Sequence, residues 1–218
     1  MMSKFKLFTS ESVSVGHPDK VADQVSDAVL DSMLHNDKNA RVACETLIKG
    51  NLVVLAGEIT ANGFEKVNLE SVVKNVIREI GYTSPEIGCN ADDLIVQNEL
   101  TPQSQEISQG VTEGEGAHKE QGAGDQGLMF GFACNETREY MPLPIQISHK
   151  LMEQQKVVRE KNTIPFLRPD AKSQVTIDYT QESPSLNAVV LSTSHGPEWS
   201  KEKDGRKISQ THDGDFTR

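Results

Sequence analysis

Histidine, proline and aspartate stand together near the N-terminus as His17-Pro18-Asp19. Proline suits the first position of a helix, and an aspartate in the first turn interacts favourably with the helix dipole. The run can therefore mark only a helix start. At a helix N-terminus, however, the same residues can bind phosphate through backbone N–H groups and a magnesium ion through the Asp19 carboxylate. Taken alone, the run leaves both interpretations open.

Two glutamates lie in a pair of β-rich runs, residues 41–49 and 52–60, which Gly50-Asn51 joins. Two such residues between strands predict a tight hairpin. The predicted cross-strand pairs are Lys49–Leu52, Leu47–Val54, Glu45–Ala56 and Ala43–Glu58. Glu45 and Glu58 become diagonal neighbours on one face, which is otherwise mostly apolar, so we expect both faces of the hairpin to be covered. The pair then marks either a solvent-facing sheet edge or a site for a metal ion or a substrate ammonium.

Two further polar segments lie next to apolar stretches, at residues 122–127 and 168–172. The first is glycine-rich. It is not a Walker A loop, because the Lys-Ser/Thr ending is missing, nor a dinucleotide fingerprint, because no helix follows. The second is a charged strand entry, which is more often solvated than catalytic. Neither segment identifies a chemistry by itself.

The elements that must position these residues follow a pattern that starts twice. The first run reads strand, helix, two strands, helix and strand, a known compact motif; its ranges are 5–8, 18–36, 41–49, 52–60, 69–80 and 94–97. Gly81 is the predicted stop of the second helix. The second run reads strand, helix and two strands; its ranges are 128–134, 144–161, 175–179 and 186–192. We therefore expect an α+β fold of repeated β-α-β-β-α-β units whose second unit is truncated.

This repeat predicts four parts of the chain. They are a first unit over residues 1–100, a mobile active-site loop over 101–121, a partial middle domain over 122–198 and a polar tail over 199–218. The loop is rich in Gly, Gln, Glu and Ser, which also fits a disordered linker. Because the second unit lacks its last helix and strand, we expect the aliphatic residues of its strands to be poorly buried; these are Val175, Ile177, Val189, Val190 and Leu191.

The composition excludes several classes of protein. A formal net charge of -10 weighs against nucleic-acid binding, which needs a basic surface. The longest apolar run, residues 52–56, is too short to cross a bilayer, and no signal-peptide-like segment begins the sequence. The cysteines are odd in number and widely spaced, which argues against a disulfide framework or zinc site and predicts a cytoplasmic protein; they are Cys44, Cys89 and Cys134.

Several long motifs stand in one order along the chain; they are Thr9–Lys20, Ala22–Gln24, Ser26–Ala28, Ala43–Thr46, Gly57–Thr60, Arg78–Tyr82, Gly122–Gly131 and Arg168–Val175. These motifs resemble those of methionine adenosyltransferases (S-adenosylmethionine synthetases). The similarity runs from about Phe8 to Ser194. It implies three repeated β-α-β-β-α-β units and active sites between the two subunits of a homodimer, often paired into a homotetramer.

The resemblance also implies substrates and residue roles. Members join the sulfur of L-methionine to the 5′ carbon of ATP and release tripolyphosphate, which they hydrolyse to phosphate and pyrophosphate. The implied ATP-binding residues are His17, Asp170 and Lys172, with His17 and Lys172 also catalytic. The implied methionine-binding residues are Glu58, Gln103 and Asp125. Asp19 would hold Mg²⁺ and Glu45 would hold K⁺, which would give the paired glutamates the cations they need.

The chain departs from the family in detail and in length. Val15 stands where many members have Glu, and Gln105 where many have Pro, but neither is an implied ligand. The rest of the middle domain and the whole third domain are missing, so we expect a truncated enzyme without significant synthetase activity alone. The alternative is a non-catalytic fragment or interaction subunit that keeps the fold. A generic nucleotide- and metal-binding module would explain His17, Asp19 and Lys172 but not the residues implied to bind methionine.

Overall fold

The computed structural model describes residues 6–103, 122–123, 126–197 and 199. The chain forms two compact units. One, called here the β7 unit, comprises Met1–Val21, Ile77–Asn90 and Ala133–Arg218. The other, the hairpin unit, comprises Ala22–Val76 and Ala91–Phe132. Both units combine helices and strands, which confirms the predicted α+β class.

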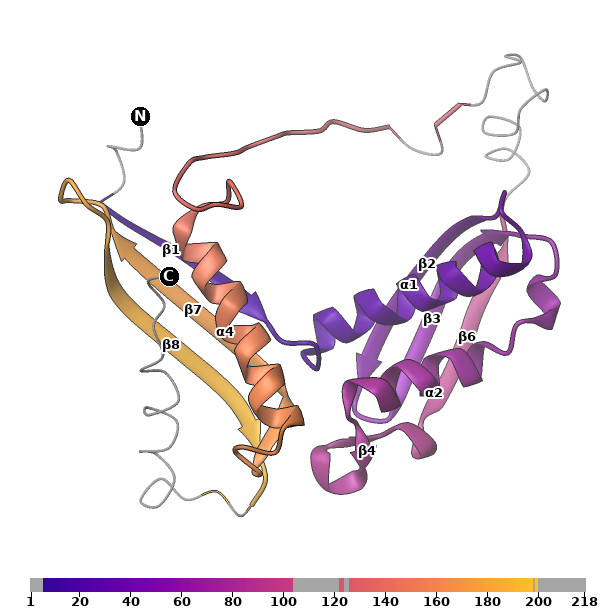
Figure 1. Ribbon diagram of the computed structural model, residues 1–218. Helices are drawn as coiled ribbons and strands as arrows, with labels where there is room; N and C mark the ends of the chain where they lie inside the picture. Colours follow the sequence, from indigo (N-terminus) through magenta and orange to yellow (C-terminus); the bar gives the residue numbers. More distant parts are fainter. Residues whose placement is uncertain (1–5, 104–121, 124–125, 198, 200–218) are drawn as a thin grey trace. The chain divides into compact units, whose positions relative to one another are not determined.

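The helices and longer strands appear in Figure 1. In chain order they are β1 (Leu7–Val13), α1 (Pro18–Asn36), β2 (Arg41–Lys49), β3 (Leu52–Thr60), α2 (Leu69–Ile80), β6 (Ile95–Pro102), α4 (Leu143–Glu160), β7 (Leu167–Asp178) and β8 (Ser185–His195). The short strands β4 (Thr83–Ser84) and β5 (Cys89–Asn90) pair with each other. Single 3-10 turns lie at Phe64–Lys66, Pro85–Ile87 and Ala91–Asp93.

The hairpin unit contains a three-stranded sheet in the order β2-β3-β6. Strands β2 and β3 are antiparallel, and their register has all four predicted cross-strand pairs, including Ala43 with Glu58 and Glu45 with Ala56. Strand β6 runs parallel to β3. Figure 1 shows α1 and α2 along one face of this sheet. Because side chains alternate along a strand, every second residue of β3 points at the helices and is buried; these are Val53, Leu55 and Ile59.

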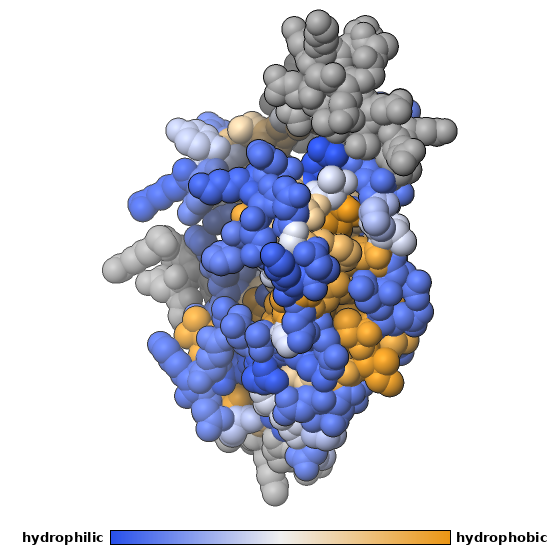
Figure 2. Space-filling view, turned by 90° about the vertical axis from the view of Figure 1, so that its right-hand side faces the viewer, coloured by the Kyte–Doolittle hydropathy of each residue, from blue (hydrophilic) through white to orange (hydrophobic). Residues whose placement is uncertain are grey.

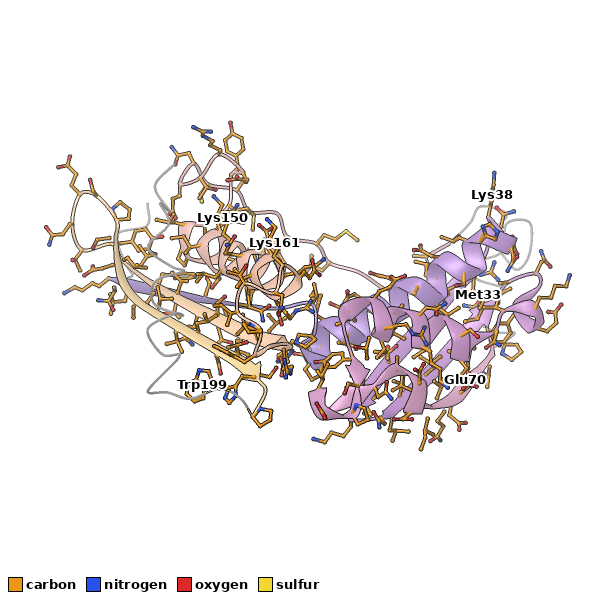
Figure 3. The ribbon with its side chains drawn as sticks, turned by 60° about the horizontal axis from the view of Figure 1, so that its bottom comes forward. Met33, Lys38, Glu70, Lys150, Lys161 and Trp199 are labelled. Carbon is orange, nitrogen blue, oxygen red and sulfur yellow. The ribbon has the colours of Figure 1, made fainter. Side chains whose placement is uncertain are left out.

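Both helices of the hairpin unit carry the apolar stripe that the sequence predicts. On α1 the buried residues recur every four residues, as Val25, Val29 and Met33. Met33 is labelled in Figure 3. On α2 the opposite face is polar, and there Lys74 pairs with Glu70 at 2.6 Å, one helical turn away. Helix α2 stops at Gly81 as predicted, because a φ of 110° is a conformation that glycine adopts at little cost.

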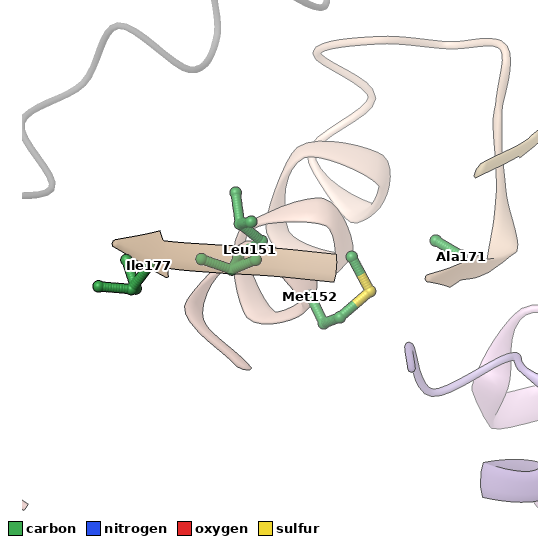
Figure 4. Packing of buried hydrophobic residues seen from close by; sticks show 5 residues of the cluster. Leu151, Met152, Ala171 and Ile177 are labelled. Atoms are coloured by element: carbon green, nitrogen blue, oxygen red, sulfur yellow. The ribbon is translucent and has the colours of Figure 1, made fainter. Parts of the chain in front are cut away.

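The β7 unit contains a second three-stranded sheet, in the order β1-β7-β8. Helix α4 covers one face of it, and the residues between them form an apolar cluster (Figure 4); its buried members are Leu151, Met152, Ala171, Val175 and Ile177. Polar contacts add to this packing. Ser148 of α4 donates to the Ser10 carbonyl of β1 at 3.1 Å, and Ser173 of β7 donates to the Ser148 carbonyl at 2.9 Å.

Several predictions about strands were wrong. The first strand, predicted over residues 5–8, covers Leu7–Val13 and pairs with β7. Residues 128–134 form no strand, and Phe130 is 92% exposed, because no described segment pairs with them. Val175 and Ile177 are fully buried, since α4 covers the central strand. Of the five residues expected to be poorly buried, Val189 and Val190 of the edge strand β8 are exposed as expected, whereas Leu191 is partly buried against the apolar cluster.

Candidate functional site

The loop between β1 and α1 is bound to the strand that carries Asp170 and Lys172. Ser14, which is buried, makes three hydrogen bonds to this part of β7. Its hydroxyl donates to the Pro169 carbonyl at 2.7 Å and accepts the Ala171 N–H at 2.7 Å, while its own N–H donates to the Ala171 carbonyl at 2.9 Å. The loop therefore starts at a fixed point on β7.

A glycine then allows the loop to pass against β7. A Cβ built on Gly16 would lie 2.4 Å from the Pro169 Cβ and 2.5 Å from its carbonyl carbon. Real carbon atoms do not approach so closely, so only glycine fits at this point. The sequence motif Gly16-His17 is thus explained by steric contact with a residue far away in the sequence. This contact brings His17 and β7 together.

His17 caps the start of α1. Its ring Nδ1 accepts the Asp19 N–H at 3.2 Å, and its carbonyl accepts the Val21 N–H at 2.8 Å. An Nδ1 that accepts a hydrogen bond leaves the proton of the neutral ring on Nε2. The Asp19 carboxylate lies 3.8 Å from Nδ1 and is 86% exposed, whereas the His17 side chain is 19% exposed. The helix start therefore presents one ring donor and one exposed carboxylate.

Asp170 and Lys172 lie on the face of β7 opposite α4, where alternate residues are partly or fully exposed. Burial raises the pKa of the Asp170 carboxyl, and the nearby charges of His17 and Lys172 lower it only in part. Lys172 Nζ lies 3.9 Å from the Glu11 carboxylate. Glu11 also accepts a 2.8 Å hydrogen bond from Gln174. His17, Asp170 and Lys172 are thus electrostatic neighbours within one unit.

Glu45, Glu58 and Gln103 lie together on the sheet of the hairpin unit. The diagonal arrangement of the two glutamates follows from the observed register. Thr101 pairs with Glu58 across β3 and β6, so Gln103 follows on the same face. The Gln103 side-chain oxygen accepts a 3.1 Å hydrogen bond from Arg41 Nε and a 3.4 Å bond from the Thr60 hydroxyl. Residues 41 to 103 therefore assemble a second group of predicted ligands.

Among the described residues, much of the face that carries these glutamates is exposed, whereas the sequence predicts that both faces are covered. We call it the outer face of the hairpin sheet; its residues are Ala43, Glu45, Leu47, Lys49, Leu52, Val54, Ala56, Glu58, Ile95, Gln97, Glu99 and Thr101. Leu47 is 59% exposed and Ile95 is 66% exposed. Within the hairpin unit, α1 and α2 both pack on the opposite face of the sheet. Figure 2 shows apolar side chains gathered in patches among hydrophilic ones on one side of the molecule.

The remaining site predictions divide as follows. Asp125 lies outside the described residues. Within the described part of the chain, no three His, Cys, Asp or Glu side chains converge as a metal cluster. No helix there is long and apolar enough to span a membrane. Sequence reasoning missed Ser14 and Glu11 as structural partners of the site, because serine and glutamate near a strand end carry no distinctive signal.

Comparisons with known proteins match both halves of the chain. A family model described as the N-terminal domain of S-adenosylmethionine synthetase matches residues 5–105. A model of the central domain of the same enzyme matches residues 120–212. The chain belongs to the S-adenosylmethionine synthetase family. This confirms the resemblance drawn from the motifs.

Two relatives show the extent of the similarity to this family. An S-adenosylmethionine synthase of Desulfosudis oleivorans is 53% identical over 198 residues, which are 90% of this chain and 50% of that protein. An S-adenosylmethionine synthase of Sorangium cellulosum is 53% identical over 192 residues, which are 88% of this chain and 45% of that protein. The chain thus spans about half the length of the curated relatives it matches.

Proposed function

We propose that this chain supplies part of the active site of an S-adenosylmethionine synthetase, with ATP and L-methionine as substrates. In this reaction the methionine sulfur forms a bond to the 5′ carbon of ATP. The bond from that carbon to oxygen breaks, and its electron pair leaves with tripolyphosphate. Hydrolysis then gives phosphate and pyrophosphate. The observation that carries the proposal is the convergence of His17, Asp170 and Lys172 at the joint between the Gly16 loop and β7.

These residues suit a polyphosphate leaving group. Charge builds up on the oxygen that leaves carbon, and donors fixed before the reaction stabilise that charge most effectively. His17 can donate from Nε2, since its Nδ1 is held by the Asp19 N–H. Lys172 adds a positive charge whose side chain is about half exposed and so accessible to a ligand. We assign catalytic roles to these two residues and ATP contact to Asp170.

A magnesium ion fits Asp19. Magnesium in nucleotide sites is usually held by one or two carboxylates together with substrate phosphates and water, so a dedicated cluster of protein ligands is not required. The Asp19 carboxylate is exposed and stands at the same helix start as His17. When bound, the ion would neutralise charge on the phosphate oxygens. Asp19 would hold the ion next to the proposed polyphosphate site.

We propose that methionine and a potassium ion bind on the outer face of the hairpin sheet. Glu58 would bind the methionine ammonium, Gln103 would contact methionine, and Asp125 would complete this set. Glu45 would be one ligand of a potassium ion, whose other ligands would come from elsewhere. Two carboxylates as diagonal neighbours repel each other unless cations compensate them. Cation binding on this face therefore explains why both residues are glutamates.

We further propose that the protein works as a homodimer or homotetramer in the cytoplasm. Support for the first statement is the outer face, on which Leu47 and Ile95 are exposed next to the glutamates. A second subunit over this face would bury it and enclose the ligands. Support for the second is that Cys44, Cys89 and Cys134 are all free thiols. Unpaired cysteines are typical of a reducing compartment.

Binding of inorganic tripolyphosphate with magnesium to the purified chain tests the proposal. The Lys172→Gln variant should bind tripolyphosphate about tenfold more weakly, because a charge-assisted contact is lost. Lys150→Gln is the matched control, since Lys150 is an exposed lysine on the solvent side of α4 in the same unit (Figure 3). We expect its affinity to match wild type. Equal weakening in both variants would mean that only net charge matters and would contradict the proposed site.

Methionine binding is tested in the same way. Glu58→Gln should weaken binding of methionine and leave binding of tripolyphosphate unchanged, because the two sets of residues belong to different sheets. Glu65→Gln is the control. Glu65 is an exposed glutamate of the same unit, but it lies on the 3-10 turn Phe64–Lys66 and not on the sheet. Unchanged methionine affinity in Glu58→Gln would remove this residue from the proposed site.

A further inference from the structure

Tyr82 reaches the Gly16 loop because of the way in which α2 ends. The Gly81 N–H donates to the Arg78 carbonyl at 3.0 Å, and the Tyr82 N–H donates to the Ile77 carbonyl at 3.1 Å. This pair of bonds is the Schellman motif, in which a glycine in a left-handed conformation reverses the chain direction. The motif fixes the backbone of Tyr82 and so the point from which its side chain starts.

The Tyr82 hydroxyl donates a 2.5 Å hydrogen bond to the Gly16 carbonyl. That carbonyl belongs to the peptide group that joins Gly16 to His17. The N–H of the same peptide group donates to the Ser14 carbonyl at 3.1 Å. The peptide plane in front of His17 is therefore held at both ends. Because that plane can no longer rotate, the direction in which the His17 side chain leaves the backbone is fixed.

The surroundings of Tyr82 keep this bond in place. Burial raises the pKa of the Tyr82 hydroxyl, and the neighbouring Asp170 carboxylate raises it further. The hydroxyl thus remains protonated and able to donate at neutral pH. It also lies within electrostatic range of a residue of the proposed ATP site, although it contacts none of the proposed ligands through an assigned hydrogen bond.

We propose that Tyr82 is a positioning residue, which holds the Gly16–His17 peptide group so that the His17 ring faces the polyphosphate. The identity of the ligand in this inference rests on the proposed function. The effect of Tyr82 on His17 does not depend on that function, because it occurs in the protein without ligand. Tyr82 would act through the loop and would not touch the substrate.

Imidazole nitrogen NMR of the 218-residue chain tests the effect on His17 without any ligand. In wild type the neutral His17 ring should carry its proton on Nε2, because Nδ1 accepts the Asp19 N–H. In Tyr82→Phe the freed peptide should let the ring leave this bond, so the spectrum should shift toward a mixture of both tautomers. Tyr179→Phe is the matched control, since the Tyr179 hydroxyl also donates at 2.9 Å, but to Glu136, near the start of α4.

Tripolyphosphate binding provides the second readout. Tyr82→Phe should weaken binding about fivefold, the effect of losing one well-placed hydrogen bond, and Tyr179→Phe should not. A wild-type chain that binds no tripolyphosphate would contradict the proposed function but not the positioning role, which the tautomer measurement decides. A His17 spectrum that is identical in Tyr82→Phe and wild type would overturn the positioning role.

A wild-type measurement covers the case in which Tyr82→Phe does not fold. The chain has three tyrosines, so 3-fluorotyrosine gives three fluorine resonances. Tyr140→Phe and Tyr179→Phe variants identify which signal belongs to which residue. On addition of tripolyphosphate the Tyr82 signal should move and the Tyr179 signal should stay. Binding that leaves the Tyr82 signal unmoved would overturn the proposal.

Discussion

At the scale of single residues, Pro169 is the point on which the proposed polyphosphate site depends. Two glycines lie against it. An added Cβ would lie 2.4 Å from the proline Cβ at Gly16, and 3.5 Å from its Cγ at Gly81. The first distance is impossible without movement of backbone, and the second is ordinary contact. A Cβ at Gly81 would also lie 2.7 Å from Arg159 Nη1, but that atom is the end of a flexible side chain and can move. The fit of Gly16 against backbone atoms is therefore the stricter of the two, although Gly81 is also restricted by its φ of 110°.

Gly16→Ala should consequently destabilise the chain by about 1–3 kcal/mol, the usual cost of overpacking, and should weaken tripolyphosphate binding. Gly50→Ala is the control. Gly50 also has a positive φ, of 56°, but a Cβ there meets nothing within 4 Å, so it should cost only about 1 kcal/mol of backbone strain. Thermal unfolding and tripolyphosphate titration measure both effects. Equal binding by Gly16→Ala and Gly50→Ala would contradict a special role for the Gly16 contact.

Asp170 predicts a dependence of stability on pH. Its pKa is raised on folding, so the ionised carboxylate disfavours the folded state above that pKa. This penalty disappears as the pH falls through the folded pKa. Asp170→Asn should therefore have a higher Tm than wild type near neutral pH, with a difference that shrinks as the solution is acidified.

Asp178→Asn should show the opposite behaviour and serves as the control. The Thr180 N–H bonds to this carboxylate and lowers its pKa. The ionised form therefore stabilises the fold, and the contribution is lost as the pH falls through the lowered pKa. Asp178→Asn should lower the Tm near neutral pH and lose its effect in acid. Thermal scans across a pH series measure both variants, and Tm differences of the same sign would refute the assignment.

The sequence shows which residues could bind ligands, but it does not show what holds them. His17 and Asp19 stand out because their types and their place at a helix start are distinctive. Ser14 and Pro169 do not stand out, since each supports the site only through its contact with the other, more than 150 residues away along the chain. A single sequence does not show which residues so far apart along the chain come into contact. Supporting residues of this kind become visible only when the chain is folded.

At the scale of elements, β7 organises its unit because it is the central strand. Its residues alternate between a face buried under α4 and a face that bears Asp170 and Lys172. The hairpin of the other unit could be predicted to the residue, because a two-residue turn fixes the register of both strands. The pairing of β1 with β7 could not, because no local signal links strands so far apart. Residues 128–134 are apolar enough for a strand, yet a strand also requires a partner.

Ile177 and Leu186 test this account of β7, since they are partners across β7 and β8. Ile177 is 1% exposed, and Leu186, at the sheet edge, is 59% exposed. Ile177→Ala should cost about 2–5 kcal/mol of unfolding free energy because it leaves a cavity under α4. Leu186→Ala should stay within about 0.5 kcal/mol of wild type. Urea unfolding measures both, and similar losses would mean that β8 is covered in solution.

At the scale of the whole molecule, the outer face of the hairpin sheet predicts self-association. We expect the chain to sediment as a dimer at micromolar concentration, because exposed aliphatic residues on a sheet are a common basis of homodimer interfaces. Leu47→Asp should give a monomer with little change in Tm, since Leu47 is mostly exposed. Val190→Asp, on the exposed edge strand of the other unit, is the control and should remain dimeric. A wild-type chain that stays monomeric would contradict this use of the face.

The pairing of Leu7 with Asp178 also has a consequence for the order in which the protein can fold during synthesis. Strand β1 is translated first, but its partner leaves the ribosome some 170 residues later, which takes about ten to thirty seconds at ordinary rates of elongation. Both strands of the hairpin lie within residues 41–60, so they can pair long before β7 has been synthesised. During this interval the backbone N–H and C=O groups of β1 have no partner strand, while other nascent chains are nearby. Shortening the wait, for example by a circular permutation that starts at β7, should therefore raise the yield of folded protein.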